Sequence, residues 1–329
     1  MVARALGLLL VTFALTACAT ATPRADLADG ATGLIRFATL TPSTGDFARR
    51  NRDVPPAIIW GELTLPHGTS GRVPAVVLVH GSGGVGHNMP GWRAELNAIG
   101  VATFIVDSFT ARGIAETASD QSRLATSAMI VDAYRALGLL ATHPAIDRDR
   151  IAVMGFSKGG GVALYSSLTR FHQDWGPPGV RFAAHLPFYP PCNLRLLDEE
   201  KVVAPIRIFH GGADDWTPVA PCRAYVERLT RAGIDAKLVE FPGALHGFDV
   251  PTLPGSLHLP RVQNGSRCDA VERAPGDFVD PATGAPLRPG VPRPCATLGA
   301  TVGHDARARN AAIAAVKAFL VERFALPAR

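Results

Sequence analysis

A single serine stands between glycines in the stretch GFSKG, which comprises residues 155–159. Apolar residues precede it in IAVM, and small or apolar residues follow it in GGVALYSS, so the stretch predicts a strand, a tight turn and a helix. Glycines two positions before and after such a serine let the backbones pass closely where a Cβ would clash. The following helix directs its N-terminal amides at the serine. The pattern favours Ser157 as a nucleophile over a glycine turn with an idle serine.

A serine nucleophile needs a histidine base, and the base needs an orienting carboxylate. Two further expected strands are followed by candidates for both roles: Asp214 and Asp215 in IRIFHGGADDWTPV, and His246 in VEFPGALHGFDV. Because the carboxyl ends of parallel strands meet at one edge of a sheet, we expect these side chains to converge on Ser157.

The sequence HGSGG follows another expected strand and supplies backbone amides for an oxyanion hole. We expect the amide of Ser82 to act together with that of Lys158, with Gly83 as the second choice for the loop donor. A plain glycine turn is the alternative. His80 and His210 are expected to pack or to hydrogen-bond within their turns. The histidines form no metal-binding spacing, so no metal is expected.

Apolar strands alternate with helices along most of the chain, which predicts an α/β fold with a mostly parallel sheet covered by helices on both faces. The expected strands are 33–40, 57–66, 73–79, 101–109, 150–157, 181–190, 204–212 and 236–243, and the expected helices are 91–100, 121–144, 222–233 and 310–324. Residues 250–303 are rich in proline and glycine, have no clear periodicity and are too long for a plain connection. We interpret them as a loop-rich insert that forms a lid or rim before the last helix.

The chain has 329 residues, of which 47% are hydrophobic, and a net charge of +5 without a run of five or six like charges. The length allows a single large domain over residues 31–329. A scattered, mildly basic surface gives no indication of nucleic-acid binding.

The N-terminus has the features of a signal peptide over residues 1–18. A positive charge at Arg4 precedes an apolar run that is too short to span a bilayer comfortably. The following LTAC is similar to a bacterial lipobox, which predicts lipidation of Cys18 and a membrane anchor. Cleavage at the small residues around ACA is the alternative. Residues 19–30 are expected to be a flexible tether, and the protein is expected to be periplasmic and anchored to the outer membrane.

Export changes the interpretation of the four other cysteines, because disulfides persist in oxidising compartments. Cys192 follows an expected strand, Cys222 begins an expected helix, and Cys268 and Cys295 bracket part of the insert. Three pairings are open, and we favour Cys192–Cys222 with Cys268–Cys295. A zinc site is the alternative, although the spacing does not support one.

Five stretches together resemble the dienelactone hydrolase family of α/β-hydrolases over residues 61–248 and the last helix. They are VHGSGG, VDSFTARGI, MGFSKGGG, HGGADDWTP and ALHGFD. The resemblance implies an α/β-hydrolase fold and cofactor-free hydrolysis of small esters or lactones through an acyl-enzyme. It also implies the order Ser, Asp, His along the chain. Asp214, with Pro218 four residues on, fits the acid better than Asp215, which then becomes a solvated or capping neighbour.

The chain departs from this family at several positions. The best-known members have a cysteine nucleophile where this chain has Ser157, and a glutamate where it has Gly81. Arg112 matches one of two arginines that bind a substrate carboxylate, so it binds an anionic substrate or pairs with a loop carboxylate.

Two aromatic side chains adjoin the candidate catalytic residues in sequence. Trp216 and Phe248 are candidates for the pocket lining, with core packing as the alternative. The function expected from the whole pattern is a serine esterase. A peptidase or acyltransferase on the same fold, and a non-catalytic envelope lipoprotein, are the alternatives. The oligomeric state is left open.

Overall fold

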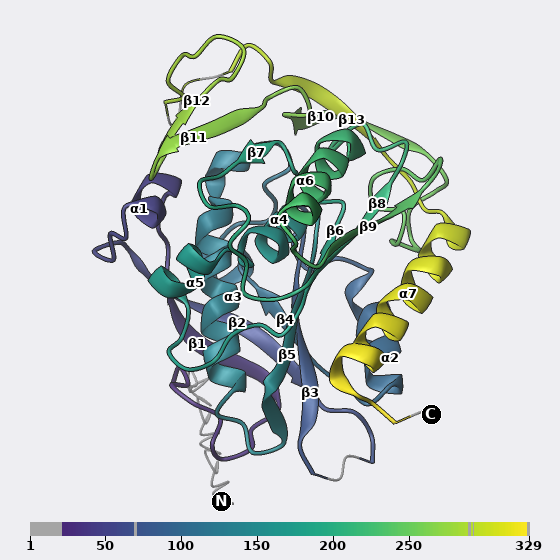
Figure 1. The fold of residues 1–329 in the computed structure, drawn as a ribbon. Coiled ribbons are helices and arrows are strands. Elements are labelled where there is room, and N and C mark those ends of the chain that lie inside the picture. Colours follow the sequence, from purple (N-terminus) through teal and green to yellow (C-terminus); the bar gives the residue numbers. More distant parts are fainter. Residues whose placement is uncertain (1–21, 69–70, 289–290, 292, 328–329) are drawn as a thin grey trace, which may run out of the picture.

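An eight-stranded sheet runs through the computed structural model, which describes residues 22–68, 71–288, 291 and 293–327 (Figure 1). The strand order is β1-β2-β4-β3-β5-β6-β8-β9. The bounds are β1 Gly33–Leu40, β2 Pro56–Thr64, β3 Val73–Val79, β4 Ala102–Asp107, β5 Ile146–Phe156, β6 His185–Phe188, β8 Ile206–Gly211 and β9 Ala236–Phe241. Strand β2 is antiparallel to both its neighbours, and all other pairs are parallel. The predicted α/β-hydrolase fold with a mostly parallel sheet is confirmed.

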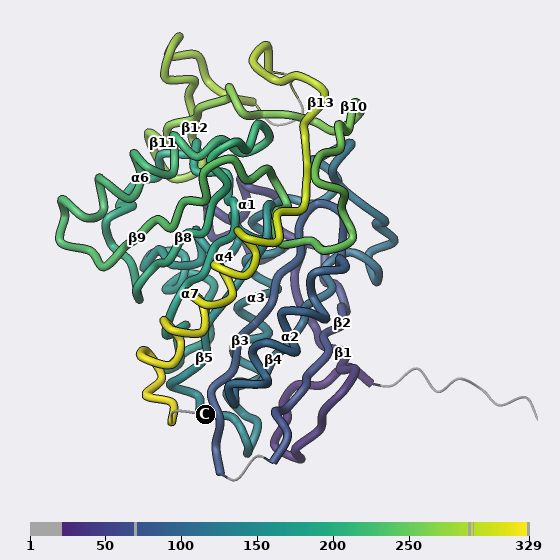
Figure 2. Tube along the Cα trace, turned by 90° about the vertical axis from the view of Figure 1, so that its right-hand side faces the viewer, coloured from purple at the N-terminus to yellow at the C-terminus, as the bar shows by residue number. Residues whose placement is uncertain are grey.

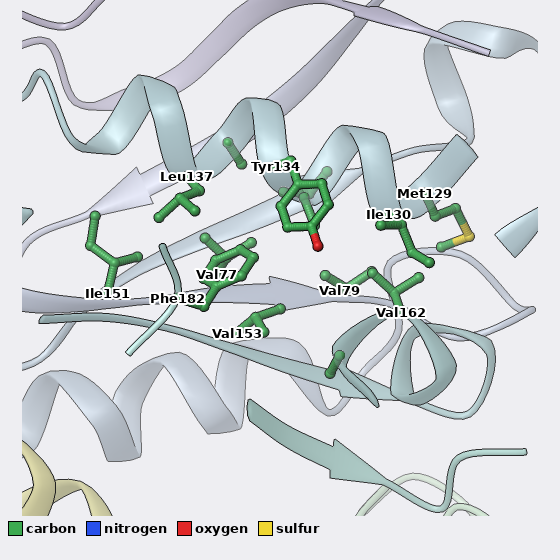
Figure 3. Close-up of a cluster of buried hydrophobic side chains, with 14 of the residues drawn as sticks. Val77, Val79, Met129, Ile130, Tyr134, Leu137, Ile151, Val153, Val162 and Phe182 are labelled. Atoms are coloured by element: carbon green, nitrogen blue, oxygen red, sulfur yellow. The ribbon is translucent and has the colours of Figure 1, made fainter. Parts of the chain in front are cut away.

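Helices cover both faces of this sheet, as its buried strands require. One face packs against α1 (Thr44–Ala48), α3 (Thr126–Leu140), α4 (Lys158–Tyr165), α5 (Thr169–Trp175) and α6 (Val219–Arg231). The other packs against α2 (Met89–Ala98) and α7 (Ala306–Phe324), which lie side by side in Figures 1 and 2. Alternate residues of β3 serve the two faces: Val77 and Val79 join the first cluster (Figure 3), and Val76 and Leu78 join the second.

Helix α3 begins five residues later than the sequence predicted. The Asp120 side chain accepts a hydrogen bond from the Ser122 amide, which stabilises a short 3-10 turn over Gln121–Arg123. Leu124 and Ala125 are then extended before the helix starts at Thr126. The 3-10 turn therefore forms part of the loop surface at the carboxyl end of the sheet.

The N-terminal segment from residue 22 packs on the sheet and is not a tether there. Arg24 forms a parallel bridge with Phe37, and the fully buried Leu27 donates its amide to Thr142. This corrects the expected flexible tether for residues 22–30, because a buried apolar side chain holds them in place. The predicted signal peptide and Cys18 lie outside the described residues. No helix in the described part of the chain is long and apolar enough to cross a membrane.

The insert between β9 and α7 contains regular strands that its composition did not indicate. They are β10 Leu257–Asn264, β11 Ala270–Ala274, β12 Asp277–Val279 and β13 Thr297–Val302. Strands β10 and β13 form one antiparallel pair, and β11 pairs with β12 and with the short β7 (Leu194–Arg195). Both views place the insert at one end of the large sheet (Figures 1 and 2). The disulfides Cys192–Cys222 and Cys268–Cys295 confirm the predicted pairing.

Candidate active site

Ser157 lies at the sharp turn from β5 into α4, with φ 55° and ψ −115°. A non-glycine residue in this conformation is strained by about 1–3 kcal/mol, so the surrounding structure must hold it. A Cβ at Gly155 would lie 1.9 Å from the Gly159 carbonyl oxygen, and a Cβ at Gly159 would lie 2.3 Å from the Val79 carbonyl oxygen. The flanking glycines therefore allow the close backbone approach that presents the serine.

The three residues singled out by type and order come together around this turn. The Nε2 atom of His246 lies 2.9 Å from Ser157 Oγ, and its Nδ1 atom lies 2.8 Å from Asp214 Oδ2. Asp214 and His246 are only 6% and 4% exposed. Such an arrangement can move a proton from the hydroxyl to the imidazole while the carboxylate orients the ring.

Asp214 is held by its own loop. Its Oδ1 atom accepts hydrogen bonds from the amides of Trp216 and Thr217, each at 2.9 Å, and the Thr217 hydroxyl lies 3.0 Å from Oδ2. Burial alone would raise the pKa of Asp214, but the charge and hydrogen bond of His246 outweigh it and lower that pKa. The neighbouring Asp215 points elsewhere, since its carboxylate accepts the amide of Thr301 at 2.7 Å.

Two aromatic rings flank the imidazole of His246. The ring centroids of Tyr189 and Trp216 lie 4.6 and 4.9 Å from that of His246. The Tyr189 hydroxyl donates to the fully buried carboxylate of Asp249 at 2.5 Å. Asp249 also accepts from Asn88 Nδ2 at 2.9 Å and from Trp92 Nε1 at 2.8 Å. Burial, followed by the Asp249 charge, raises the pKa of Tyr189 well above its usual value.

The amides of Ser82 and Lys158 were expected to form an oxyanion hole. Within the described part of the chain, neither amide donates to another backbone group. The Ser82 loop is held by its carbonyl, which accepts from Thr117 at 2.7 Å, and by its hydroxyl, which contacts the Gln121 side chain. His80 Nδ1 lies 2.8 Å from the Gly81 carbonyl oxygen, so this histidine bonds within its turn. His210 does the same with the Gly211 carbonyl oxygen at 3.0 Å.

A pocket of about 300 Å³ opens over Ser157. Its walls come from the 3-10 turn, the loop after β6, the start of α6 and the insert, and include Gln121, Asn193, Trp216, Gln263 and Ser266. The Lys158 ammonium donates to the backbone carbonyl and to the side chain of Gln121, each at 3.1 Å. Burial lowers the pKa of Lys158 to about 8.

Two residues expected in the pocket lie elsewhere. Arg112 makes a two-pronged ion pair with the fully buried carboxylate of Asp132, at 2.7 and 2.9 Å, and lines a groove on the β1–β2 side of the molecule. Arg112 therefore pairs with a carboxylate, as one alternative held, but that carboxylate belongs to helix α3 and not to a loop. Phe248 is fully buried and packs on Phe188 and Phe241, so it belongs to the core and does not line the pocket.

Several residues around the site had no sequence signal. Gln121 and Gln263 approach the pocket from segments predicted as a helix and as a loop, and the sequence pattern singled out neither Tyr189 nor Asp249. Only position could have suggested Asp249, because it follows His246 by three residues. The described residues contain no cluster of three or more histidine, cysteine, aspartate or glutamate side chains able to hold a metal ion.

Comparisons with known proteins agree with this geometry. A family model described as the dienelactone hydrolase family matches residues 60–274. Among solved structures, the chain is similar to a propionate-bound thermophilic esterase from Thermogutta terrifontis, with 17% identity, a TM-score of 0.53 and coverage of 86% of this chain and 94% of that one. It is also similar to a dienelactone hydrolase-like promiscuous phosphotriesterase from metagenomic libraries, with 16% identity, a TM-score of 0.51 and coverage of 88% and 98%. No curated protein matches the chain.

Proposed function

Because the chain belongs to the dienelactone hydrolase family, we propose that it is a serine hydrolase that cleaves small carboxylic esters or lactones. One observation carries this proposal: the series of hydrogen bonds from Asp214 through His246 to Ser157, at 2.8 and 2.9 Å. The esterase named in the structural comparison binds propionate, a small acid, which is consistent with a small acyl group here.

The reaction proceeds in two halves through an acyl-serine. Ser157 Oγ attacks the ester carbonyl carbon while His246 Nε2 takes its proton, and Asp214 stabilises the resulting imidazolium. The tetrahedral intermediate collapses when the alkoxide leaves with the proton from Nε2. A water molecule then attacks the acyl-serine, again giving a proton to Nε2, and Ser157 recovers that proton as the acid departs.

Charge develops on the carbonyl oxygen during both halves of the reaction. The amides of Ser82 and Lys158 donate to this oxyanion, and Lys158 also begins a helix whose N-terminus favours negative charge. Loss of one such donor raises the barrier by about 3 kcal/mol, which corresponds to about a hundredfold loss in rate.

The replacement Ser157→Ala tests the assignment of the nucleophile. We expect hydrolysis of p-nitrophenyl acetate to fall to background while the thermal unfolding midpoint shows a folded protein. Wild-type protein should also be labelled covalently by a fluorophosphonate, and the variant should not. A variant that keeps its activity, or a wild-type protein that is neither active nor labelled, would contradict the proposal and favour a binding scaffold.

We also propose that residues 1–18 direct export and that Cys18 carries a lipid anchor to the outer membrane. The apolar run, the LTAC sequence and two disulfides in the folded chain support this, because disulfides persist in oxidising compartments. Radiolabelled palmitate should enter the wild-type protein and not a Cys18→Ser variant. Recovery of unlabelled wild-type protein in the soluble periplasmic fraction would contradict the anchor.

A further inference from the structure

The insert forms part of the wall of the pocket over Ser157, and its strand β10 is hydrogen-bonded to loops on both sides of the site. On one side, the Gln263 amide donates to the Ala118 carbonyl at 2.8 Å, and the Gln121 amide donates to Gln263 Oε1 at 2.8 Å. On the other side, Trp216 Nε1 donates to the Gln263 carbonyl at 2.8 Å. Gln263 thus joins the segment of Ala118 and Gln121, on the side of the expected oxyanion hole, to the loop that carries Asp214.

The same acid loop is held a second time by the insert. The Asn264 side chain donates to the Asp215 carbonyl at 3.1 Å, and the Asp215 carboxylate accepts the Thr301 amide from β13. Strand β13 continues to the loop of the candidate base, where the Gly303 amide donates to the His246 carbonyl at 3.0 Å. Both partners of Ser157 therefore sit in loops attached to the β10–β13 pair.

The far end of the insert is attached to the body as well. Asn193 Nδ2 donates to the Cys268 carbonyl at 2.6 Å, and the Ala270 amide donates to the Asn193 carbonyl at 3.0 Å. The nearly buried carboxylate of Glu272 forms an ion pair with Arg170. These contacts make the insert a roof fixed to several loops, unlike a flap on one hinge, and the Cys268–Cys295 disulfide closes a loop within the insert itself.

The space below this roof is small. Its volume of about 300 Å³ is at the lower end of the range of about 300–1,000 Å³ for ligand pockets. The buried ammonium of Lys158 and the side chains of Gln121 and Gln263 line it. These groups bond to one another but keep further hydrogen-bonding capacity, for example the third ammonium hydrogen of Lys158 and the side-chain amide of Gln263. A long alkyl chain would displace water from that remaining capacity without replacing its hydrogen bonds, and this desolvation is unfavourable.

We infer that the insert is a fixed roof that restricts the site to short-chain, water-soluble esters, and that Gln263 is a specificity-determining residue. This inference rests on the proposed ester hydrolysis and goes further by naming the substrate class. The roof excludes long acyl chains sterically and through the polar groups it holds at the mouth. Since the roof is attached to loops on several sides, the enzyme needs no opening at a lipid surface.

The test compares p-nitrophenyl acetate, butyrate and octanoate with wild-type protein, Gln263→Ala and Arg261→Ala. Arg261 is the matched control, because it is an exposed residue of the same strand, two residues away, and is not among the residues that line the pocket. Gln263→Ala loses only the bond from Gln121 to Oε1, because both backbone bonds of residue 263 remain. We expect the ratio of octanoate to acetate kcat/KM to rise at least about tenfold in Gln263→Ala and to stay at the wild-type value in Arg261→Ala.

Wild-type protein should already prefer acetate and butyrate to octanoate by about tenfold or more. Its rate on tributyrin should not jump when the ester exceeds its solubility. A wild-type preference for octanoate, such a jump, or an unchanged ratio in Gln263→Ala would overturn the fixed roof. Fluorophosphonate labelling separates the two proposals: a labelled enzyme without the expected selectivity refutes only the roof, whereas an unlabelled and inactive protein refutes the ester hydrolase itself.

Discussion

The replacement Asp214→Asn gives a sharp test of how the acid acts, because the structure fixes each oxygen of the carboxylate. Oδ1 accepts two backbone amides of its own loop, and Oδ2 faces His246 Nδ1. In the asparagine variant the oxygen can keep the two amides, which leaves the NH₂ group facing His246. An amide nitrogen only donates, so Nδ1 must become an acceptor and the ring proton must move to Nε2.

An imidazole in that tautomer cannot take a proton from Ser157. We therefore expect kcat on p-nitrophenyl acetate to fall by about 10⁴, which corresponds to about 5 kcal/mol in the barrier. The fold should survive, because both backbone hydrogen bonds to residue 214 are kept. Steady-state kinetics measure the loss, and a thermal melt of the same preparation measures the stability.

Asp215→Asn is the matched control for this prediction. Asp215 is exposed and bonded to Thr301, and an asparagine oxygen can replace that acceptor. Its kcat should stay within about threefold of wild type, which corresponds to less than 1 kcal/mol. A large loss in Asp215→Asn with little loss in Asp214→Asn would refute the reasoning and make Asp215 the acid.

Two further predictions concern buried charges near the site. Asp249→Leu leaves three buried donors without an acceptor, so it should lower the free energy of unfolding by about 4 kcal/mol. Asp249→Asn keeps one acceptor oxygen and should lower it by only about 1–2 kcal/mol. Urea unfolding measures both losses, and equal losses would contradict this prediction. Lys158→Met should raise the free energy of unfolding at pH 7 by about 1–2 kcal/mol, because a pKa lowered from 10.5 to about 8 means that the folded state buries an unfavourable charge. Between pH 8 and 10.5 the unfolded wild-type chain binds more protons than the folded one, so the free energy of unfolding of the wild type rises with pH. The difference in the free energy of unfolding between Lys158→Met and wild type should therefore shrink over this range. A difference that stays constant with pH would contradict this prediction.

The sheet and the serine turn were predictable because their requirements are local. The backbone contacts at Gly155 and Gly159 admit no side chain, so the glycine spacing itself marks the turn. Strand β3 was predicted at its observed bounds, since each of its residues is buried and apolar. The order of Asp214 and His246 after later strands then brought them to the same edge, because parallel strands share their carboxyl ends.

Side-chain partners were less predictable, because they depend on segments that are distant in sequence. The partner of Arg112 is Asp132, which α3 carries to it twenty residues later. Phe248 is close to His246 in sequence, but Gly247 has φ 74° and turns the chain between them. The ring of Phe248 therefore enters the core while the imidazole faces Ser157. Sequence proximity to a catalytic residue predicts the loop and does not predict the side chain's direction.

The strands of the insert are the clearest example of structure that the sequence did not predict, because few buried apolar side chains hold them. Strand β10 buries only Val262 and Asn264 along its length, so no alternation of polar and apolar residues could reveal it. Hydrogen bonds to distant loops hold this strand, and a disulfide closes the loop between residues 268 and 295 of the insert. Only the cysteines could be recognised in the sequence. The same segment supplies part of the pocket wall. The chemistry of the site thus rests on local patterns that can be recognised in the sequence, whereas its selectivity rests on contacts that only the folded chain creates.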